Sequence, residues 1–315
     1  MGKPCQESGN CLLASLAMFP LGPPRGGQAK PAHPVSALPL FLVDAFTAEP
    51  FKGNPAAVCV HDRPLADGVL QAIAREMNCS ETAFVQLADG AQGAGPLPLR
   101  WFTPITEMPI CGHATLATAK VLFDTFLPGR ETLAFATRSG LLTVAREGPA
   151  LAMDFPADRV VPVPVHAALA EALGAPAIVA AFRGEATGKW VFRLSSEAEV
   201  RGLRPDFAAL GRLEVPGLRG LGVTAPGHGS CDCVSRYFNP WAGVDEDPVT
   251  GSVHTLLAPY WCQELGKEHL LACQASARGG EILLRLEPER ERVILAGQAV
   301  VLLRGQLQLP EGSRD

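Results

Sequence analysis

The stretch RWFTP at residues 100–104 returns as RYFNP at residues 236–240, an offset of 136 residues. Each copy is followed by an acidic residue and then by a second pair of matching motifs, PICG at 109–112 and PVTG at 248–251. A repeat of this length is far longer than the unit of a solenoid protein. Chance recurrence of common turn residues is the alternative explanation. We expect two homologous domains that face each other.

The residues around each copy indicate a strand, a turn and a buried helix. Alternating apolar residues at 97–102 predict a strand that leads to a proline turn. The helix predicted from residue 113 to 124 is apolar nearly all round, so it should be buried. The matching helix at 253–261 contains Pro259, which should kink or shorten it. Each domain should therefore wrap a sheet around one central helix.

Both predicted helices begin at a glycine, and helix starts attract anions. Cys111 and Gly112 stand at the first start, and Thr250 and Gly251 stand at the second. Unpaired N–H groups and the helix dipole favour negative charge at such a position. If the two starts meet, they can hold a substrate carboxylate and stabilise the enolate-like charge that forms when a proton leaves the adjacent carbon. The sequence thus predicts a small carboxylic acid as substrate.

An acid–base group must move that proton, and three side chains are candidates. His113 belongs to the residue type that titrates near neutral pH, although a role in capping or in the core is the alternative. Asp247 could instead cap the second helix. Glu81 lies between a predicted helix at 67–78 and a strand that begins at Phe84, so it could point into a cleft or into solvent. Burial in a cleft would raise its pKa toward the working pH.

Length and composition describe a globular protein of ordinary kind. The chain has 315 residues, which favours two domains, and 47% of the residues are hydrophobic. The net charge of −5 argues against binding to nucleic acid or to an anionic membrane. Glycine-rich nucleotide-binding motifs and a G-x-S-x-G elbow are absent, which disfavours nucleotide binding and a serine hydrolase.

The nine cysteines have scattered positions and form no C-x-x-C motif. This pattern indicates a reducing compartment, so we expect a cytoplasmic protein. Cys231 and Cys233 are the only close pair, and we expect two unrelated thiols there, because a metal site would need two more ligands. Most other cysteines should be small buried residues. We expect neither a metal nor a cofactor.

The first 37 residues differ from the rest. The apolar run at 11–21 is interrupted by Pro20 and is too short to span a membrane, and no signal-peptide pattern surrounds it. Proline and glycine are frequent after it, which indicates a disordered leader over residues 1–37. The two domains should then cover 38–150 and 151–307, with the option that the last strand returns to the first domain, and 308–315 should be a tail.

Further motifs extend the repeat into a family pattern. They are DAF at 44–46, GNPAAV at 53–58, SETAF at 80–84, CGHAT at 111–115 and EDPVTGS at 246–252. In this order they resemble the PhzF family, named for an isomerase of phenazine biosynthesis, and most of all its animal members. The similarity runs from about Leu40 to about Leu307. It implies the diaminopimelate epimerase fold, an α/β (α+β) fold of two pseudo-symmetric domains, each with a curved sheet around a central helix.

The resemblance also implies roles for individual residues. Glu81 corresponds to the general acid and base that carries a proton between substrate carbons. His113, Asp247 and Ser252 correspond to residues that orient the substrate or hydrogen-bond to it. Two-thiol racemases of this fold have one cysteine at each helix start, whereas this chain has Cys111 at one start and threonine at the other. A two-thiol mechanism is therefore excluded, and proton transfer by Cys111 alone stays open.

The function implied is that of an isomerase in a biosynthetic process. It would move a proton on a small carboxylic acid bound between the domains, without cofactor or metal, and the protein would form a homodimer. The alternative is a catalytically idle binding or regulatory protein, because one animal member of the family is named for binding MAWD, a WD-repeat protein. The complete set of Glu81, His113, Asp247 and Ser252 favours the enzyme.

Overall fold

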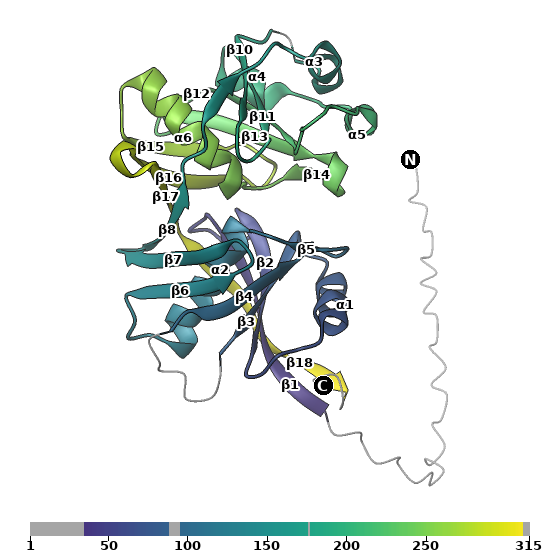
Figure 1. The fold of residues 1–315 in the computed structure, drawn as a ribbon, viewed down its shortest axis with the longest axis vertical. Helices are drawn as coiled ribbons and strands as arrows, with labels where there is room; N and C mark the ends of the chain where they lie inside the picture. The colour runs from purple at the N-terminus through teal and green to yellow at the C-terminus, as the bar shows by residue number, and fades with distance from the viewer. Residues whose placement is uncertain (1–34, 88–94, 176, 311–315) are drawn as a thin grey trace, which may run out of the picture. The chain divides into compact units, whose positions relative to one another are not determined.

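The computed structural model describes residues 35–87, 95–175 and 177–310. The strands of the N-terminal half are β1 (Val35–Ala45), β2 (Asn54–His61), β3 (Glu81–Gln86), β4 (Leu97–Phe102), β5 (Glu107–Met108), β6 (Thr132–Thr137), β7 (Gly140–Glu147) and β8 (Ala150–Pro156). Its helices are α1 (Asp67–Met77) and α2 (Gly112–Val121), and α2 continues into a π-helical turn, η1 (Leu122–Phe126). This half surrounds α2 in Figure 1.

The C-terminal half contains β9 (Val160–Pro162), β10 (Ala180–Gly184), β11 (Trp190–Arg193), β12 (Leu221–Pro226), β13 (Cys233–Asn239), β14 (Val244–Asp247), β15 (His269–Gln274), β16 (Gly280–Glu287) and β17 (Arg292–Gly297). Its helices are α3 (Ala167–Leu173), α4 (Glu197–Gly202), α5 (Phe207–Arg212) and α6 (Gly251–Leu265), with 3-10 turns η2 (Pro240–Ala242) and η3 (Pro288–Arg290). The last strand is β18 (Ala299–Pro310).

The pattern of strand pairing in the first half repeats in the second. β1 is antiparallel to β2, β2 is parallel to β3, β3 is antiparallel to β4, and β4 is parallel to β6. In the same order, β10 is antiparallel to β11, β11 is parallel to β12, β12 is antiparallel to β13, and β13 is parallel to β15. The two copies of the sequence repeat lie on the corresponding strands β4 and β13. The sequence repeat is therefore a structural repeat.

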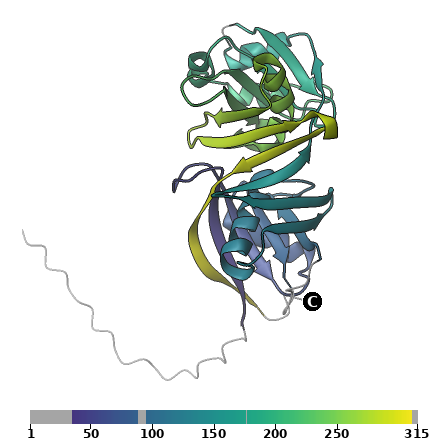
Figure 2. The ribbon, with the colours of Figure 1, turned by 90° about the vertical axis from the view of Figure 1, so that its left-hand side faces the viewer.

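Two strand pairs join the halves. β8 pairs with β17 in antiparallel register, and β18 returns to the first half, where it pairs with β1 (Figures 1 and 2). This second pairing runs from Val35 opposite Pro310 to Ala45 opposite Ala299. The paired strands thus extend past the domain boundaries expected at residues 38 and 307. The leader and the tail otherwise lie outside the described residues.

The central helices behave largely as their composition predicts. Eight of the ten residues of α2, and nine residues of α6, are buried. The expectation that Pro259 shortens the second helix is wrong, because α6 continues to Leu265. A proline at this position cannot donate to the carbonyl of Thr255, and that carbonyl instead accepts from the N–H of Asp158 at 3.0 Å. The oxygen that the proline leaves unpaired within the helix is thus satisfied by a neighbouring loop.

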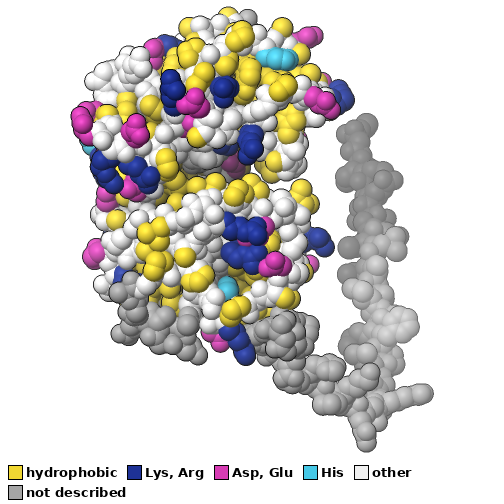
Figure 3. Space-filling model, viewed as in Figure 1, with side chains coloured by type: hydrophobic (Ala, Val, Ile, Leu, Met, Phe, Trp, Pro, Cys, Tyr) yellow, Lys and Arg dark blue, Asp and Glu magenta, His cyan; other side chains and the backbone are white. Residues whose placement is uncertain are grey.

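Other helices cover the outer faces of the sheets. Leu70, Ile73 and Ala74 of α1 are buried against the sheet of the first half, in a cluster with Phe84 and Phe102. A separate cluster contains residues of α3, α4 and α5 and of β10–β13. No helix within the described ranges is both long and apolar enough to cross a membrane. Side chains of both charges are interspersed on the face drawn in Figure 3.

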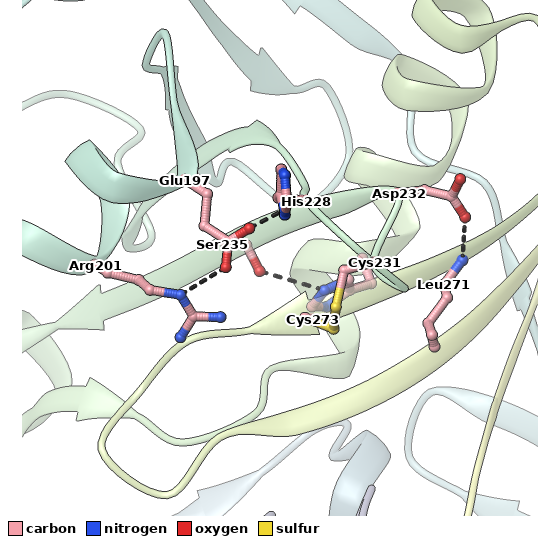
Figure 4. The surroundings of a disulfide bond; sticks show 9 residues. Glu197, Arg201, His228, Cys231, Asp232, Ser235, Leu271 and Cys273 are labelled. Carbon is pink, nitrogen blue, oxygen red and sulfur yellow. Dashed lines mark hydrogen bonds and ion pairs between the residues drawn. A yellow bond between two sulfur atoms is a disulfide. The ribbon is translucent and has the colours of Figure 1, made fainter.

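One cysteine expectation is wrong. Cys231 is not an unrelated thiol: it forms a disulfide with Cys273, which is 42 residues later in β15 (Figure 4). The bend before β13 is held beside β15 by Asp232, whose carboxylate accepts from the N–H of Leu271. Disulfides are typical of oxidising compartments, so this pair weakens the inference of a reducing compartment that was drawn from the scattered cysteines. Cys233 is buried and outside the disulfide, as expected.

Candidate active site

The first residues of α2 and α6 lie against each other. A Cβ added to Gly112 would lie 3.6 Å from the Cα of Gly251, and one added to Gly251 would lie 3.7 Å from the Cα of Gly112. The preceding residues, Cys111 and Thr250, make no side-chain capping bond to their helices. Two positive helix ends without side-chain caps therefore meet, which is the arrangement that the repeat predicted.

Glu81 and His113 are in contact beside this meeting point. A carboxylate oxygen of Glu81, the first residue of β3, lies 3.3 Å from Nε2 of His113, and the hydroxyl of Ser80 lies 3.2 Å from the same nitrogen. Nδ1 faces two donors, the amide nitrogen of Asn54 at 3.1 Å and the thiol of Cys111 at 3.5 Å. A ring nitrogen that faces donors accepts, so we assign the proton of the neutral ring to Nε2, toward Glu81.

Asn54 connects this cluster to the other half of the molecule. Its amide nitrogen lies within hydrogen-bond distance of Oδ1 of Asp247 at 2.8 Å and of the carbonyl oxygen of Val249 at 2.9 Å, and these two acceptors share its two N–H bonds with Nδ1 of His113. Its own oxygen accepts from the hydroxyl of Ser80 at 3.2 Å. The side chain is fully buried, where polar groups need partners. Asn54 thus places Asp247, at the end of β14, within one hydrogen-bond network with His113.

Gln274 holds the second helix start in place. Its Oε1 accepts from the backbone N–H of Thr250 at 2.8 Å, and its Nε2 donates to the backbone oxygen of Asp247 at 2.7 Å. The hydroxyl of Thr250 in turn donates to Oδ2 of Asp247 at 2.6 Å. Both carboxylate oxygens of Asp247 therefore accept hydrogen bonds, one from each half of the molecule.

Burial sets the protonation of this cluster. Burial raises the pKa of Glu81 to about 8, and the charge of Asp247 adds to the rise. Burial also raises the pKa of Asp247, against hydrogen bonds from Thr250 and Asn54 that lower it. The pKa of His113 falls to about 3, again through burial, so the ring is neutral at pH 7 and its contact with Glu81 is a hydrogen bond rather than an ion pair.

Among the residues that the structure describes, one group of side chains has the spacing of metal ligands. Glu81, Cys111 and His113 each offer a ligand atom, and these atoms lie within 4.8 Å of one another. Burial and the charge of Glu81 raise the pKa of the Cys111 thiol well above its usual value. Because a metal ligand must be the thiolate, this shift opposes metal binding and favours a thiol that stays protonated.

A cavity of about 590 Å³ lies at the two helix starts. Its lining includes Gly112, Gly251, Ser252, Lys189, Asp158, Phe155 and Leu295. Glu81, His113 and Asp247 do not line it, although 16% of the Glu81 side chain is exposed. The structure therefore brings Ser252 together with the two glycines, and Glu81, His113 and Asp247 into a cluster next to them.

Sequence reasoning did not assign four residues that the site uses. Asn54 and Ser80 lie inside the motifs GNPAAV and SETAF, so the motifs themselves could have indicated them. Gln274 and Lys189 stand outside every motif, and only the packing of β15 and β11 brings them to the site.

Known proteins are similar in sequence to this chain over nearly all of its described residues. Residues 43–305 match the family model of phenazine biosynthesis-like proteins, PhzC-PhzF. A Pseudomonas aeruginosa protein named an uncharacterized isomerase is 49% identical over 86% of this chain and 99% of its own length. The mouse phenazine biosynthesis-like domain-containing protein 2 is 44% identical over 86% of this chain and 99% of its own length.

Solved structures agree with the fold that the resemblance implied. The crystal structure of a PhzF-family protein from Enterococcus faecalis covers 87% of this chain and 100% of that chain, with a TM-score of 0.80 at 41% identity. A predicted epimerase from Pseudomonas aeruginosa and a hydroxyproline epimerase from Agrobacterium vitis, both at much lower identity, share the fold alone. It is the diaminopimelate epimerase-like fold of two pseudo-symmetric halves. The chain belongs to the PhzF family of phenazine biosynthesis-like proteins.

Proposed function

We propose that this protein is an isomerase that moves a proton on a small carboxylic acid bound at the two helix starts, without a cofactor. One observation supports the proposal above all others. A carboxyl group with a pKa of about 8, that of Glu81, contacts a neutral histidine beside two positive helix ends that abut each other. Relatives named isomerases point to the same class of reaction.

The reaction would begin with binding of the substrate carboxylate. The N–H groups at Gly112 and Gly251 and the hydroxyl of Ser252 are donors at the cavity, and they suit an anion. Ionised Glu81 would then take a proton from the carbon next to the carboxylate. The C–H bond breaks, its electron pair moves into an enolate, and the helix ends stabilise the new charge.

The second step returns the proton. Protonated Glu81 would deliver it to another carbon of the same substrate, where the new C–H bond takes up the electron pair. No oxidant or reductant is needed, since the proton and the electron pair both stay within the substrate and Glu81. Near pH 8 the two forms of Glu81 are equally populated, which suits a group that must accept and donate. His113 would orient the carboxylate of Glu81 through its Nε2–H.

Deuterium exchange tests this proposal. The protein is incubated in D₂O with a panel of small carboxylic acids, after dialysis against a chelator, and mass spectrometry follows deuterium uptake at carbon. We expect uptake by at least one acid, at a rate that dialysis does not lower. If no acid gains deuterium while the folded protein still binds carboxylates, the idle binding protein is the better account.

Three further properties remain predictions: a homodimer, a location in the cytoplasm and a WD-repeat partner. Sedimentation of the purified chain checks the first. Fractionation of cells checks the second, and binding to purified MAWD checks the third.

A further inference from the structure

Lys189 lies at the cavity in a position that its neighbours fix. Its Nζ donates to the hydroxyl of Tyr237 at 2.7 Å, and that hydroxyl donates to the carbonyl oxygen of Arg219 at 2.7 Å. Gly220 makes room for the hydroxyl, since a Cβ there would lie only 1.9 Å from it. The side chain of Tyr237 is itself buried. The ammonium group is thus anchored on a buried hydroxyl that the backbone holds in place.

The ammonium group of Lys189 has donors to spare. An ammonium group carries three N–H bonds, and among the described residues only Tyr237 accepts one of them. The nearby carboxylate of Asp158 is occupied, because it accepts from the backbone N–H groups of Ala186 and Thr187 and from the Thr187 hydroxyl. Two N–H bonds of Lys189 are therefore left for a ligand in the cavity.

Lys189 stays charged in this setting. Burial lowers its pKa to about 8, while the charges of Asp247, Glu81 and Asp158 act in the opposite direction. None of these carboxylates forms an ion pair with it in the described structure. A partly buried cation without an ion-pair partner is unfavourable, and an anionic ligand would provide the missing charge.

The same cavity also contains the two helix starts and apolar side chains, including Phe155, Leu295 and Ile110. We propose that Lys189 binds a second acidic group of the substrate, so that the substrates of this protein are small dicarboxylic acids with an apolar or aromatic middle. The inference rests on the proposed function only for the first carboxylate of the substrate, which the N–H groups at the two helix starts would hold.

Four simple probes test the second carboxylate. Benzoate carries one carboxylate on a ring, and the three benzene dicarboxylates carry two at different separations. Titration calorimetry at pH 7 compares their affinities for the wild-type protein, for Lys189→Met and for the control Lys267→Met, which changes an exposed lysine outside the cavity. Circular dichroism checks that each variant is folded.

We expect at least one dicarboxylate to bind the wild type about 10-fold more tightly than benzoate, the size of one charge-assisted hydrogen bond. Lys189→Met should abolish this preference, and Lys267→Met should keep it. Tyr237→Phe, which removes the anchor of the ammonium group, should weaken it. A preference that survives Lys189→Met overturns the proposal, as does a wild type that binds no dicarboxylate more tightly than benzoate.

The titration needs no turnover, so the two proposals can fail separately. If the wild type exchanges no deuterium but still prefers a dicarboxylate over benzoate, the proposed isomerase activity is wrong and the second carboxylate site is still supported. If the wild type exchanges deuterium but Lys189→Met binds dicarboxylates and benzoate with the same preference as the wild type, the isomerase activity is supported and the second carboxylate site is wrong.

Discussion

The surroundings of Glu81 favour the protonated form of its carboxyl group. It is largely removed from water, which favours its neutral form, and it faces a neutral histidine and a second carboxylate. A carboxyl group whose pKa is raised by folding binds its proton more tightly in the folded state than in the unfolded one. Stability from this group is therefore complete below the unfolded pKa and is lost as the pH rises through the folded pKa.

This linkage gives a stability prediction. Between about pH 5 and pH 8, the free energy of unfolding of the wild type should fall relative to Glu81→Gln by roughly 1.4 kcal/mol per pH unit, because one proton is held by the folded state and not by the unfolded state. Urea unfolding at several pH values measures the difference. Glu49→Gln, which changes an exposed carboxyl group, is the control. Parallel pH profiles for wild type and Glu81→Gln would contradict the raised pKa.

At the scale of elements, the meeting of α2 and α6 depends on two glycines. The space between Gly112 and Gly251 holds no more than a methyl group at van der Waals distance. Gly251→Val should force the helix starts apart and lower the affinity for benzoate by about 10-fold or more, since the N–H donors would no longer converge. Gly202→Val, at the end of α4 where a Cβ meets open space, is the matched control. Equal benzoate affinity in Gly251→Val would place the anion elsewhere.

The disulfide joins two further elements. Cys231–Cys273 closes a loop between residues 42 positions apart, and in the chain-entropy description such a bond stabilises the folded state by about 4 kcal/mol. Replacing both cysteines by alanine should lower the free energy of unfolding by an amount of this order, measured by urea unfolding without reductant. Dithiothreitol should destabilise the wild type and leave the double variant unchanged. A wild type that is insensitive to reductant, with thiols titrating at both positions, would mean that the bond does not form.

At the scale of the whole molecule, Arg–carboxylate pairs join the halves, and two of them, Arg278–Asp44 and Arg285–Glu147, differ in burial. Arg278 donates to the fully buried Asp44 at 2.7 Å and also to the backbone oxygens of Gly53 and Lys52. Arg285 pairs with Glu147 on the surface, where both side chains are more than one-third exposed.

Truncating these two arginines should therefore have unequal effects. Arg278→Ala should cost about 3–5 kcal/mol of stability, because it leaves the buried carboxylate of Asp44 without its cation, with only the N–H of Phe51 as donor, and removes the side-chain donor of two carbonyl groups. Arg285→Ala should cost less than about 1 kcal/mol. Urea unfolding of both variants measures the costs. Equal costs would show that burial of Asp44 does not control the stability of this contact.

The sequence predicted the parts of the fold and the site that are encoded locally. The repeat predicted the two central helices and their glycine starts, because strand, turn and helix signals lie within a few residues. Local patterns placed Glu81 between a helix and a strand expected from Phe84, but the strand already begins at Glu81 itself. The sequence could not predict that Cys273 pairs with Cys231, or that Gln274 and Lys189 reach the site, because the pairing of β13 with β15 and of β11 with β12 decides those contacts. The expected shortening of the helix at Pro259 does not occur, because the carbonyl group that the proline leaves unpaired is satisfied by the N–H of Asp158, which is far away in the sequence.

The central claim is that Glu81 carries the proton. The most direct test compares deuterium exchange by the wild type, Glu81→Gln and Cys111→Ala on one acid that the wild type labels, with benzoate binding as a check on the site. We predict a loss of at least ~100-fold for Glu81→Gln, the lower end for removing a general acid and base, with benzoate binding intact and little change for Cys111→Ala. If Glu81→Gln exchanges as fast as the wild type while Cys111→Ala does not exchange, the proton carrier is the thiol and the assignment of Glu81 is wrong.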